Sequence, residues 1–148
     1  YHQNQNRQRN YKYKKSNFKM IWNLVFSIIW TIIIIIGSAI SGNTLDHVSI
    51  LKIPHIDKII HFIWYYVLYI SWYSYFLKKN VRFIKIRYRL FLIITIICFG
   101  WVIELFQQYV FIKRSAELND FIADSMGVIM AFTTYFYAYQ SKLFGRFL

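Results

Sequence analysis

Cysteine and acidic residues are scarce in this chain, and so is charge in general. The 148 residues include one Cys, six Asp and Glu, and only 16% charged residues, against 57% hydrophobic and 22% aromatic ones. The lone Cys98 excludes an internal disulfide, and inside an apolar stretch such a thiol is most often inert packing. The sequence shows no internal repeat, no Gly-Ser linker and no sign of a second domain. At this length it predicts a single domain.

Long apolar runs take up most of the chain. A bilayer is crossed by about 20 predominantly apolar residues, and four stretches are long enough: residues 20–40, 59–77, 90–112 and 121–139. The first carries no charge between Met20 and Ile40 and lacks the polar stripe of a soluble helix. It is also longer than the apolar core of a signal peptide, about 7–15 residues, so an uncleaved anchor is predicted.

These stretches predict an all-α membrane protein, a four-helix transmembrane bundle within residues 20–148. Residues 1–19 are polar and basic, and we expect a cytoplasmic tail that is disordered or lies on the membrane surface. The fourth span is the weakest, because Asp124 costs about 2.5–3.5 kcal/mol at a helix centre, roughly what its few Leu, Ile, Val and Phe residues offset. It is therefore expected to depend on neighbouring helices.

Basic residues are segregated along the chain. Fourteen of the 18 Lys and Arg lie in the N-terminal tail, in residues 78–89 or after residue 140. The positive-inside rule then predicts that both termini lie in the cytoplasm. In a soluble protein a net charge of +12 would suggest nucleic acid. Since no nucleic-acid-binding motif accompanies the charge, membrane lipids are the expected partners and nucleic acid is not.

Polar groups that hydrocarbon rejects interrupt three of the spans. Ionisable groups at membrane depth are costly unless paired or hydrated, which makes them candidates for function. They are His61 with Asp57 four residues before it, Glu104 with Gln107 and Gln108, and Asp124 with Asp120 four residues before it. Spacings of three and four put the members of each set on one helix face. Because all three sets lie toward external helix ends, a single polar pocket open to the outer leaflet is predicted.

Small residues indicate how the fourth span packs. Gly127 and Ala131 form a small-xxx-small pair on the same face as Asp124, which lets another helix approach closely. The neighbouring Val128 is expected to face lipid.

Two motifs and three single residues form a recognisable pattern: DKIIHF at 57–62, ELFQ at 104–107, and then Arg114, Asp120 and Gly127. The pattern resembles that of the VanZ-like family of bacterial membrane proteins over about half of the chain. Asp124 departs from it, because the family commonly has Asn at this place. The family is named for a protein associated with low-level resistance to teicoplanin, a lipid-tailed glycopeptide. The resemblance implies a location in the bacterial cytoplasmic (inner) membrane and a role at the cell envelope, and it supplies no reaction.

Candidate roles follow from the chemistry of these side chains. If the protein is an enzyme, Glu104 or Asp124 is the expected acid or base, with His61 relaying protons. The candidate binding residues are Asp57, Lys58, Gln107, Arg114 and Asp120, of which Lys58 and Arg114 would meet an anionic headgroup.

The residues at the helix starts also have structural explanations. Asp57 and Asp120 would cap backbone N–H groups and meet the positive end of the helix dipole. Lys58 would be an interfacial anchor whose stem lies along the apolar surface.

The deeper residues have structural explanations as well. His61 would donate a hydrogen bond to a carboxylate on another helix, and Glu104 and Arg114 would form a buried ion pair. Gln107 would fix the orientation of Glu104. A metal is not expected, because no spacing such as HExxH marks a site, and no cofactor is expected.

The sequence therefore favours recognition or processing of an amphiphile in the outer leaflet, such as an envelope lipid, a lipid-linked envelope precursor or a lipoglycopeptide. The alternative is a non-catalytic accessory subunit with protein partners in a larger membrane complex. A water-accessible pocket would favour the first function, and a sealed, fully paired network the second. Spacings of the acid phosphatase family are absent, and so are the inverted repeats and broken helices of transporters.

Overall fold

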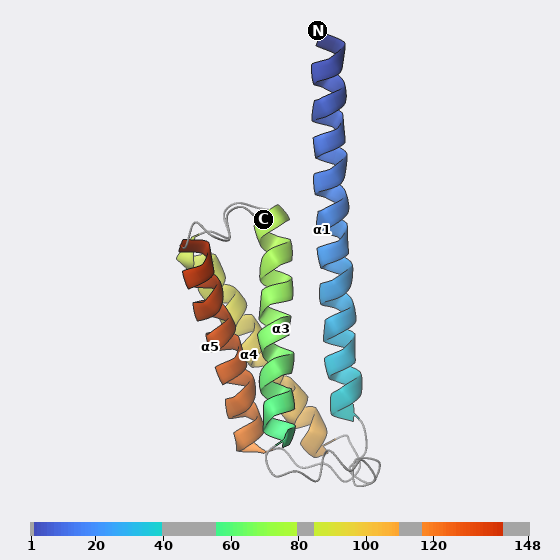
Figure 1. Cartoon of the computed structure of the whole chain (residues 1–148). Coiled ribbons are helices and arrows are strands. Elements are labelled where there is room, and N and C mark those ends of the chain that lie inside the picture. Colours follow the sequence, from blue (N-terminus) through green and yellow to red (C-terminus); the bar gives the residue numbers. More distant parts are fainter. Residues whose placement is uncertain (1, 40–55, 80–84, 110–116, 141–148) are drawn as a thin grey trace.

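The computed structural model describes residues 2–39, 56–79, 85–109 and 117–140, and these form four helices and no strand. They are α1 (His2–Ala39), α3 (Ile56–Lys79), α4 (Ile86–Tyr109) and α5 (Leu118–Gln140) (Figure 1). The all-helical fold predicted from the sequence is confirmed over this part of the chain. Two helical segments, Asn17–Ala39 and Ile86–Tyr109, are long and apolar enough to cross a membrane.

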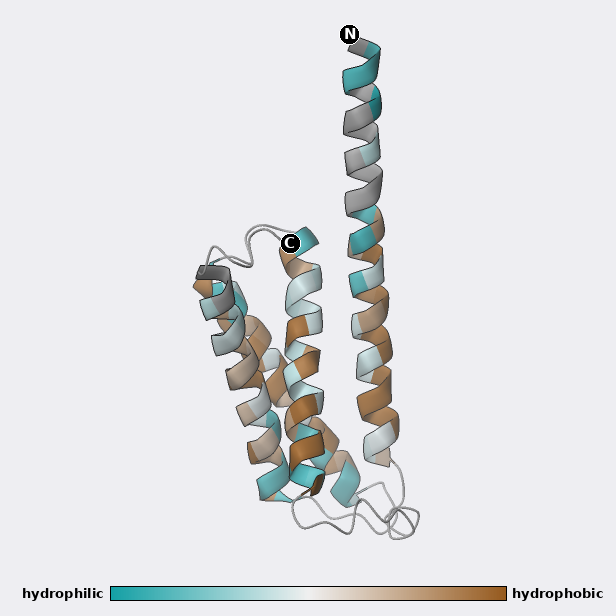
Figure 2. Ribbon diagram, in the orientation of Figure 1, coloured by the Kyte–Doolittle hydropathy of each residue, from teal (hydrophilic) through white to brown (hydrophobic). Residues whose placement is uncertain are grey.

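Helix α1 is much longer than the predicted first span. Its 38 residues correspond to about 57 Å at 1.5 Å per residue, against about 30 Å of hydrocarbon in a bilayer. The N-terminal half is hydrophilic and projects beyond the other helices (Figures 1 and 2). Of the two predicted states of this tail, disordered or lying on the membrane surface, the first is therefore wrong. Nucleation is the unfavourable step in helix formation, so a helix already formed in the apolar half extends easily into the preceding residues. Neither Gly nor Pro occurs before Gly37 to interrupt it.

The core is built around α3, which packs most extensively on α5 and next on α1. Tyr65, Tyr69 and Tyr73 recur every four residues along one face of α3, and each is 1% exposed. The outward faces of α1 and α4 are apolar instead, as Figure 2 shows for the C-terminal half of α1. Such extended apolar surfaces require a non-aqueous neighbour.

The α3–α5 contact is a close approach of two backbones. A Cβ atom added at Gly127 would collide with the carbonyl oxygen of Phe62 on α3, so only glycine fits at this point. Val128 is fully buried, and the prediction that it faces lipid is wrong. The contact face of α5 is wide enough to include Val128 as well as Gly127, whereas Met126 and Ile129 on either side of them are exposed.

Arg89 is a second residue whose position differs from the sequence analysis, which assigned it to a cytoplasmic loop. Helix α4 already begins at Ile86, so Arg89 lies within its first turns and is 5% exposed. The guanidinium carbon lies 5.5 Å from the ring centre of Tyr73 and 6.0 Å from that of Phe136. These rings supply the aromatic faces that make a buried guanidinium tolerable.

Candidate functional site

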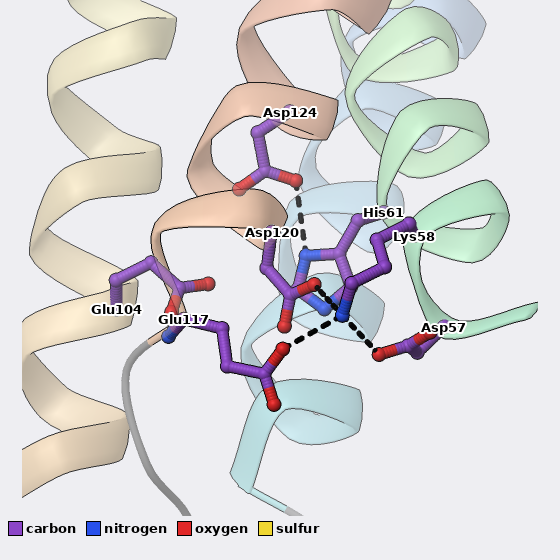
Figure 3. Close-up of polar contacts among 7 residues, drawn as sticks. All are labelled: Asp57, Lys58, His61, Glu104, Glu117, Asp120 and Asp124. Atoms are coloured by element: carbon purple, nitrogen blue, oxygen red, sulfur yellow. Dashed lines mark hydrogen bonds and ion pairs between the residues drawn. The ribbon is translucent and has the colours of Figure 1, made fainter. Parts of the chain in front are cut away.

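Most of the acidic residues of the chain converge at one end of the bundle. Figure 3 shows them with Lys58 and His61, where α3 and α5 begin and α4 ends. Five of the six acidic residues take part: Asp57, Glu104, Glu117, Asp120 and Asp124. We refer to these seven residues as the acidic cluster.

Lys58 holds the outer part of the acidic cluster together. Its Nζ lies 2.6 Å from Asp57, 2.7 Å from Glu117 and 2.9 Å from Asp120, so it joins the first turns of α3 and α5. Burial alone would lower the pKa of Lys58, but hydrogen bonds to these carboxylates outweigh it and raise the pKa. Burial likewise opposes ionisation of Asp57, but the bond to Lys58 prevails and lowers the pKa of that carboxyl. The lysine is therefore engaged within the chain and not left for an anionic headgroup.

His61 and Asp124 form the buried part of the acidic cluster. His61 Nδ1 lies 3.0 Å from Asp124 Oδ1, and the two residues are 4% and 1% exposed. An ionised carboxylate only accepts hydrogen bonds, so with Asp124 ionised the ring donates through Nδ1–H. The hydrogen bond to a carboxylate on another helix, one of the two explanations considered for His61, is thus the arrangement found.

Glu104 reaches the acidic cluster from α4. It is 3% exposed, and its Oε2 accepts a hydrogen bond of 3.3 Å from the backbone N–H of Glu117. Gln107 does not orient it as predicted, because its Nε2 donates instead to the carbonyl oxygen of Ser38 at 3.3 Å. That bond ties α4 to α1. Gln108 is exposed, and Arg114 lies outside the described residues.

Several buried oxygens of the acidic cluster have no hydrogen-bond partner. They are Glu104 Oε1, Asp124 Oδ2 and Asp120 Oδ1, the last of which has an ion pair with Lys58. The buried hydroxyl of Tyr65 on α3, outside the cluster, has no hydrogen-bond partner either. Gly100 lies between these groups, since a Cβ there would be 3.2 Å from the Tyr65 ring and 3.3 Å from Asp124 Oδ2. Buried polar atoms are nearly always satisfied in folded proteins. The cluster is therefore not a fully paired network among the described residues.

An apolar cavity of about 310 Å³ lies deeper in the bundle, between α1, α3 and α4. Its lining consists of Thr31, Leu68, Trp72, Phe76, Leu92, Thr95, Ile96 and Phe99. The ring of Phe99 in the cavity lining lies 6.3 Å from that of Tyr65, whose hydroxyl is one of the unpaired groups. A second cavity, between Asn23, Ser71 and Lys78, lies at the other end of α3. The acidic cluster lines neither of these two cavities, so the predicted open polar pocket is not among them.

Glu117 is the residue of the acidic cluster that sequence analysis missed. It contacts Lys58 through its carboxylate and Glu104 through its backbone N–H. The available signal was its place three residues before Asp120, where the backbone carbonyl of Glu117 accepts the Asp120 N–H at 3.0 Å and begins α5. Acidic residues are common at helix starts, and capping provided a sufficient explanation.

Apolar outward faces and a buried acidic cluster at the helix ends define an all-helical membrane protein with a polar site. A VanZ/LLP1 family profile matches residues 1–140, and the chain belongs to that family. The resemblance noted in the sequence is thereby confirmed, and at the level of the family the protein is a VanZ-like protein of the cell envelope. No curated protein and no solved structure matches the chain.

Proposed function

We propose that this protein recognises or processes an amphiphilic molecule of the bacterial cell envelope. The candidates are an envelope lipid, a lipid-linked precursor or a lipoglycopeptide such as teicoplanin. In this proposal the four helices form a transmembrane bundle in the cytoplasmic membrane, with both termini in the cytoplasm. The acidic cluster then lies at the outer leaflet.

One observation carries the proposal: Glu104 on α4 has an unpaired carboxylate oxygen, and deeper along the same helix α4 lines an apolar cavity. An amphiphile has the matching shape, with a polar head for the carboxylates and an alkyl chain for the cavity. A volume of about 310 Å³ is at the lower end of the range of about 300–1,000 Å³ for ligand sites. Tyr65 and Phe99 form the boundary between the two parts.

The residues of the acidic cluster would have different roles in binding or catalysis. Glu104 has one oxygen fixed by Glu117 N–H and the other unpaired, which suits a group that accepts a proton or a headgroup N–H. Asp124 holds His61 in one orientation, as a base or relay requires. Lys58 positions Asp120, and Asp57 belongs to the same ion-pair group.

Lipid retention tests the proposal. In Thr95→Trp an indole would enter the apolar cavity, whereas in Ile94→Trp it would point outward, because Ile94 is 60% exposed and outside the lining. Each full-length protein is purified in mild detergent, and bound lipid is measured by native mass spectrometry. We expect Thr95→Trp to lose a lipid that wild type and Ile94→Trp retain. A wild-type protein without bound lipid, or equal retention in both variants, would contradict the proposal and favour the accessory subunit.

Teicoplanin gives a second measurement on the same variants. Expression of the wild-type protein in a susceptible bacterium is expected to raise the inhibitory concentration of teicoplanin. Thr95→Trp should abolish that effect and Ile94→Trp should preserve it. Protection that survives in both variants would mean that the alkyl chain does not use this cavity.

The proposed topology has its own test. Single cysteines are placed in residues 42–54, 115–119 and 79–87 of a Cys98→Ala protein, since Cys98 is exposed in the structure and would itself react. An impermeant maleimide added to intact cells should label the first two segments and spare the third. Labelling of residues 79–87 alone would reverse the orientation.

A further inference from the structure

The inner half of the acidic cluster has the composition of a metal site. His61, Glu104 and Asp120 each offer one ligand atom, these atoms lie within 4.8 Å of one another, and all three residues are buried. Two ligands on one zinc ion lie at most about 4.2 Å apart, twice a bond of about 2.1 Å. Because the three ligand atoms lie within 4.8 Å of one another, small side-chain adjustments would bring them within this limit. We infer that these residues bind a divalent transition metal ion.

A neighbouring group of carboxylates shows what the inner group lacks. Asp57, Glu117 and Asp120 are also close enough to share a cation, and there the cation is Lys58, within 2.9 Å of all three. The inner group shares Asp120. No Lys or Arg in the described part of the chain forms an ion pair with Glu104 or Asp124. Lys58 therefore supplies a cation to every member of the outer group, whereas in the inner group it reaches Asp120 alone.

An unpaired oxygen independently indicates a missing ligand. Glu104 is 97% buried, and its Oε1 has no hydrogen-bond partner. Figure 3 shows one oxygen of Glu104 pointing toward His61 and Asp120. Leaving such an atom buried and unpaired is expensive, and a cation at this point would satisfy it.

Each inferred ligand is held by a further contact, as is usual around bound metals. Asp124 contacts His61 Nδ1 and leaves Nε2 with its lone pair for the metal. The N–H of Glu117 binds Glu104 Oε2 and leaves Oε1. Lys58 contacts Asp120 Oδ1. Because these contacts fix the tautomer and orientation of each ligand in the metal-free protein, they raise the affinity of the site for the metal.

The donor set indicates which ions fit. One imidazole nitrogen and two carboxylate oxygens suit Zn²⁺ and Mn²⁺, whereas Mg²⁺ and Ca²⁺ prefer oxygen ligands alone. Neutral His61, two carboxylates and a divalent ion together carry no net charge, which is the arrangement that low-dielectric surroundings favour. Three ligands also leave a coordination position for water or for part of a substrate. This inference does not rest on the proposed function, because the site could be purely structural.

Metal binding is measured on the full-length protein, purified without a polyhistidine tag and stripped with a chelator. Zn²⁺ is added, and bound metal is determined by calorimetry and elemental analysis, with Mg²⁺ for comparison. We expect one Zn²⁺ per chain in wild type, and affinity reduced more than about 100-fold in Glu104→Gln and in Asp120→Asn. Asp124→Leu removes the hydrogen-bond acceptor of His61 and should weaken binding about 10–100-fold, as loss of an outer-shell partner does.

Asp57→Asn is the matched control. It removes one negative charge from the same cluster but no inferred ligand, so affinity should change by less than about threefold. Size-exclusion profiles identify any variant that fails to fold, and the wild-type stoichiometry does not depend on the variants. Wild-type protein that binds no Zn²⁺ or Mn²⁺ below about 100 µM would overturn the inference. Binding that Glu104→Gln and Asp57→Asn weaken equally would also overturn it, because such a cation would be held only by the charge of the cluster.

Discussion

His61 Nδ1 and Asp124 Oδ1 lie 3.0 Å apart although 63 residues separate them in the chain. The contact joins α3 to α5 inside the bundle, one helical turn from the point where Gly127 meets Phe62. An asparagine at position 124, as the resemblance described above implies for the family, would have an amide oxygen that accepts the same hydrogen bond. The geometry thus explains why both residue types fit there, and why an apolar one would not.

Substitution of Asp124 tests this explanation. Asp124→Leu should lower the free energy of unfolding by about 1–3 kcal/mol, because His61 would remain buried without its acceptor. Asp124→Asn should be much closer to wild type. Thermal unfolding in detergent measures both. Equal losses in the two variants would show that the charge of Asp124, and not the hydrogen bond, matters for stability.

Gly127→Ala is expected to be more destabilising than alanine at any exposed position of α5. The added methyl would collide with the Phe62 carbonyl, and backbone atoms cannot move aside without separating the helices, a strain of about 1–3 kcal/mol. Met126→Ala is the control, since Met126 is adjacent and 57% exposed. Gly100→Ala should be intermediate, because its nearest contacts, at 3.2 Å and 3.3 Å, are side-chain atoms. Near wild-type melting of Gly127→Ala would mean that α3 and α5 are not so close.

Lys58→Met should destabilise the protein through Asp120 more than through its other partners. The side chain of Asp120 is 9% exposed, whereas those of Asp57 and Glu117 are 47% and 48% exposed and can be solvated. We expect a loss of about 1–3 kcal/mol, and partial recovery in Lys58→Met/Asp120→Asn. Lys79→Met, in the last turn of the same helix, is the control and should be near neutral. Without recovery in the double variant, the ion pair with Asp120 would not be the cause.

Glu104 and Arg114 distinguish a site from a scaffold. If both serve binding, Glu104→Gln and Arg114→Gln should leave folded protein that no longer supports envelope function. If they form a structural pair, each single change strands a buried charge at a cost of about 3–5 kcal/mol. The protein would then be lost from the membrane, and the double variant should partly restore it. Membrane abundance measured alongside teicoplanin protection separates the two outcomes.

The sequence predicted the helices and most members of the acidic cluster because both depend on local spacing. Asp57 with His61, and Asp120 with Asp124, are one helical turn apart, and each pair lies at the start of its helix. Once the outward faces are apolar, such groups can only meet inside the bundle. The motif residues Glu104 and Gln107 are buried for the same reason.

What the sequence did not predict depends on contacts between helices. The partner of Gln107 is a carbonyl on α1, and nothing in the spacing along α4 distinguishes that oxygen from the carboxylate of Glu104. Burial of Val128 depends on how widely α5 faces α3. The inferred metal ligands come from three different helices, so no short motif could have indicated them.

The contact between Gly127 and the Phe62 carbonyl has a mechanical consequence. Two backbones in such close contact cannot slide or separate by small steps, so α3 and α5 must move as one rigid body. Helix α1 has far fewer contacts with α4 than with α3, and the apolar cavity lies along that weaker seam. A molecule that enters from the bilayer would therefore separate α1 from α4 by moving one of these two helices, while α3 and α5 keep their positions relative to each other.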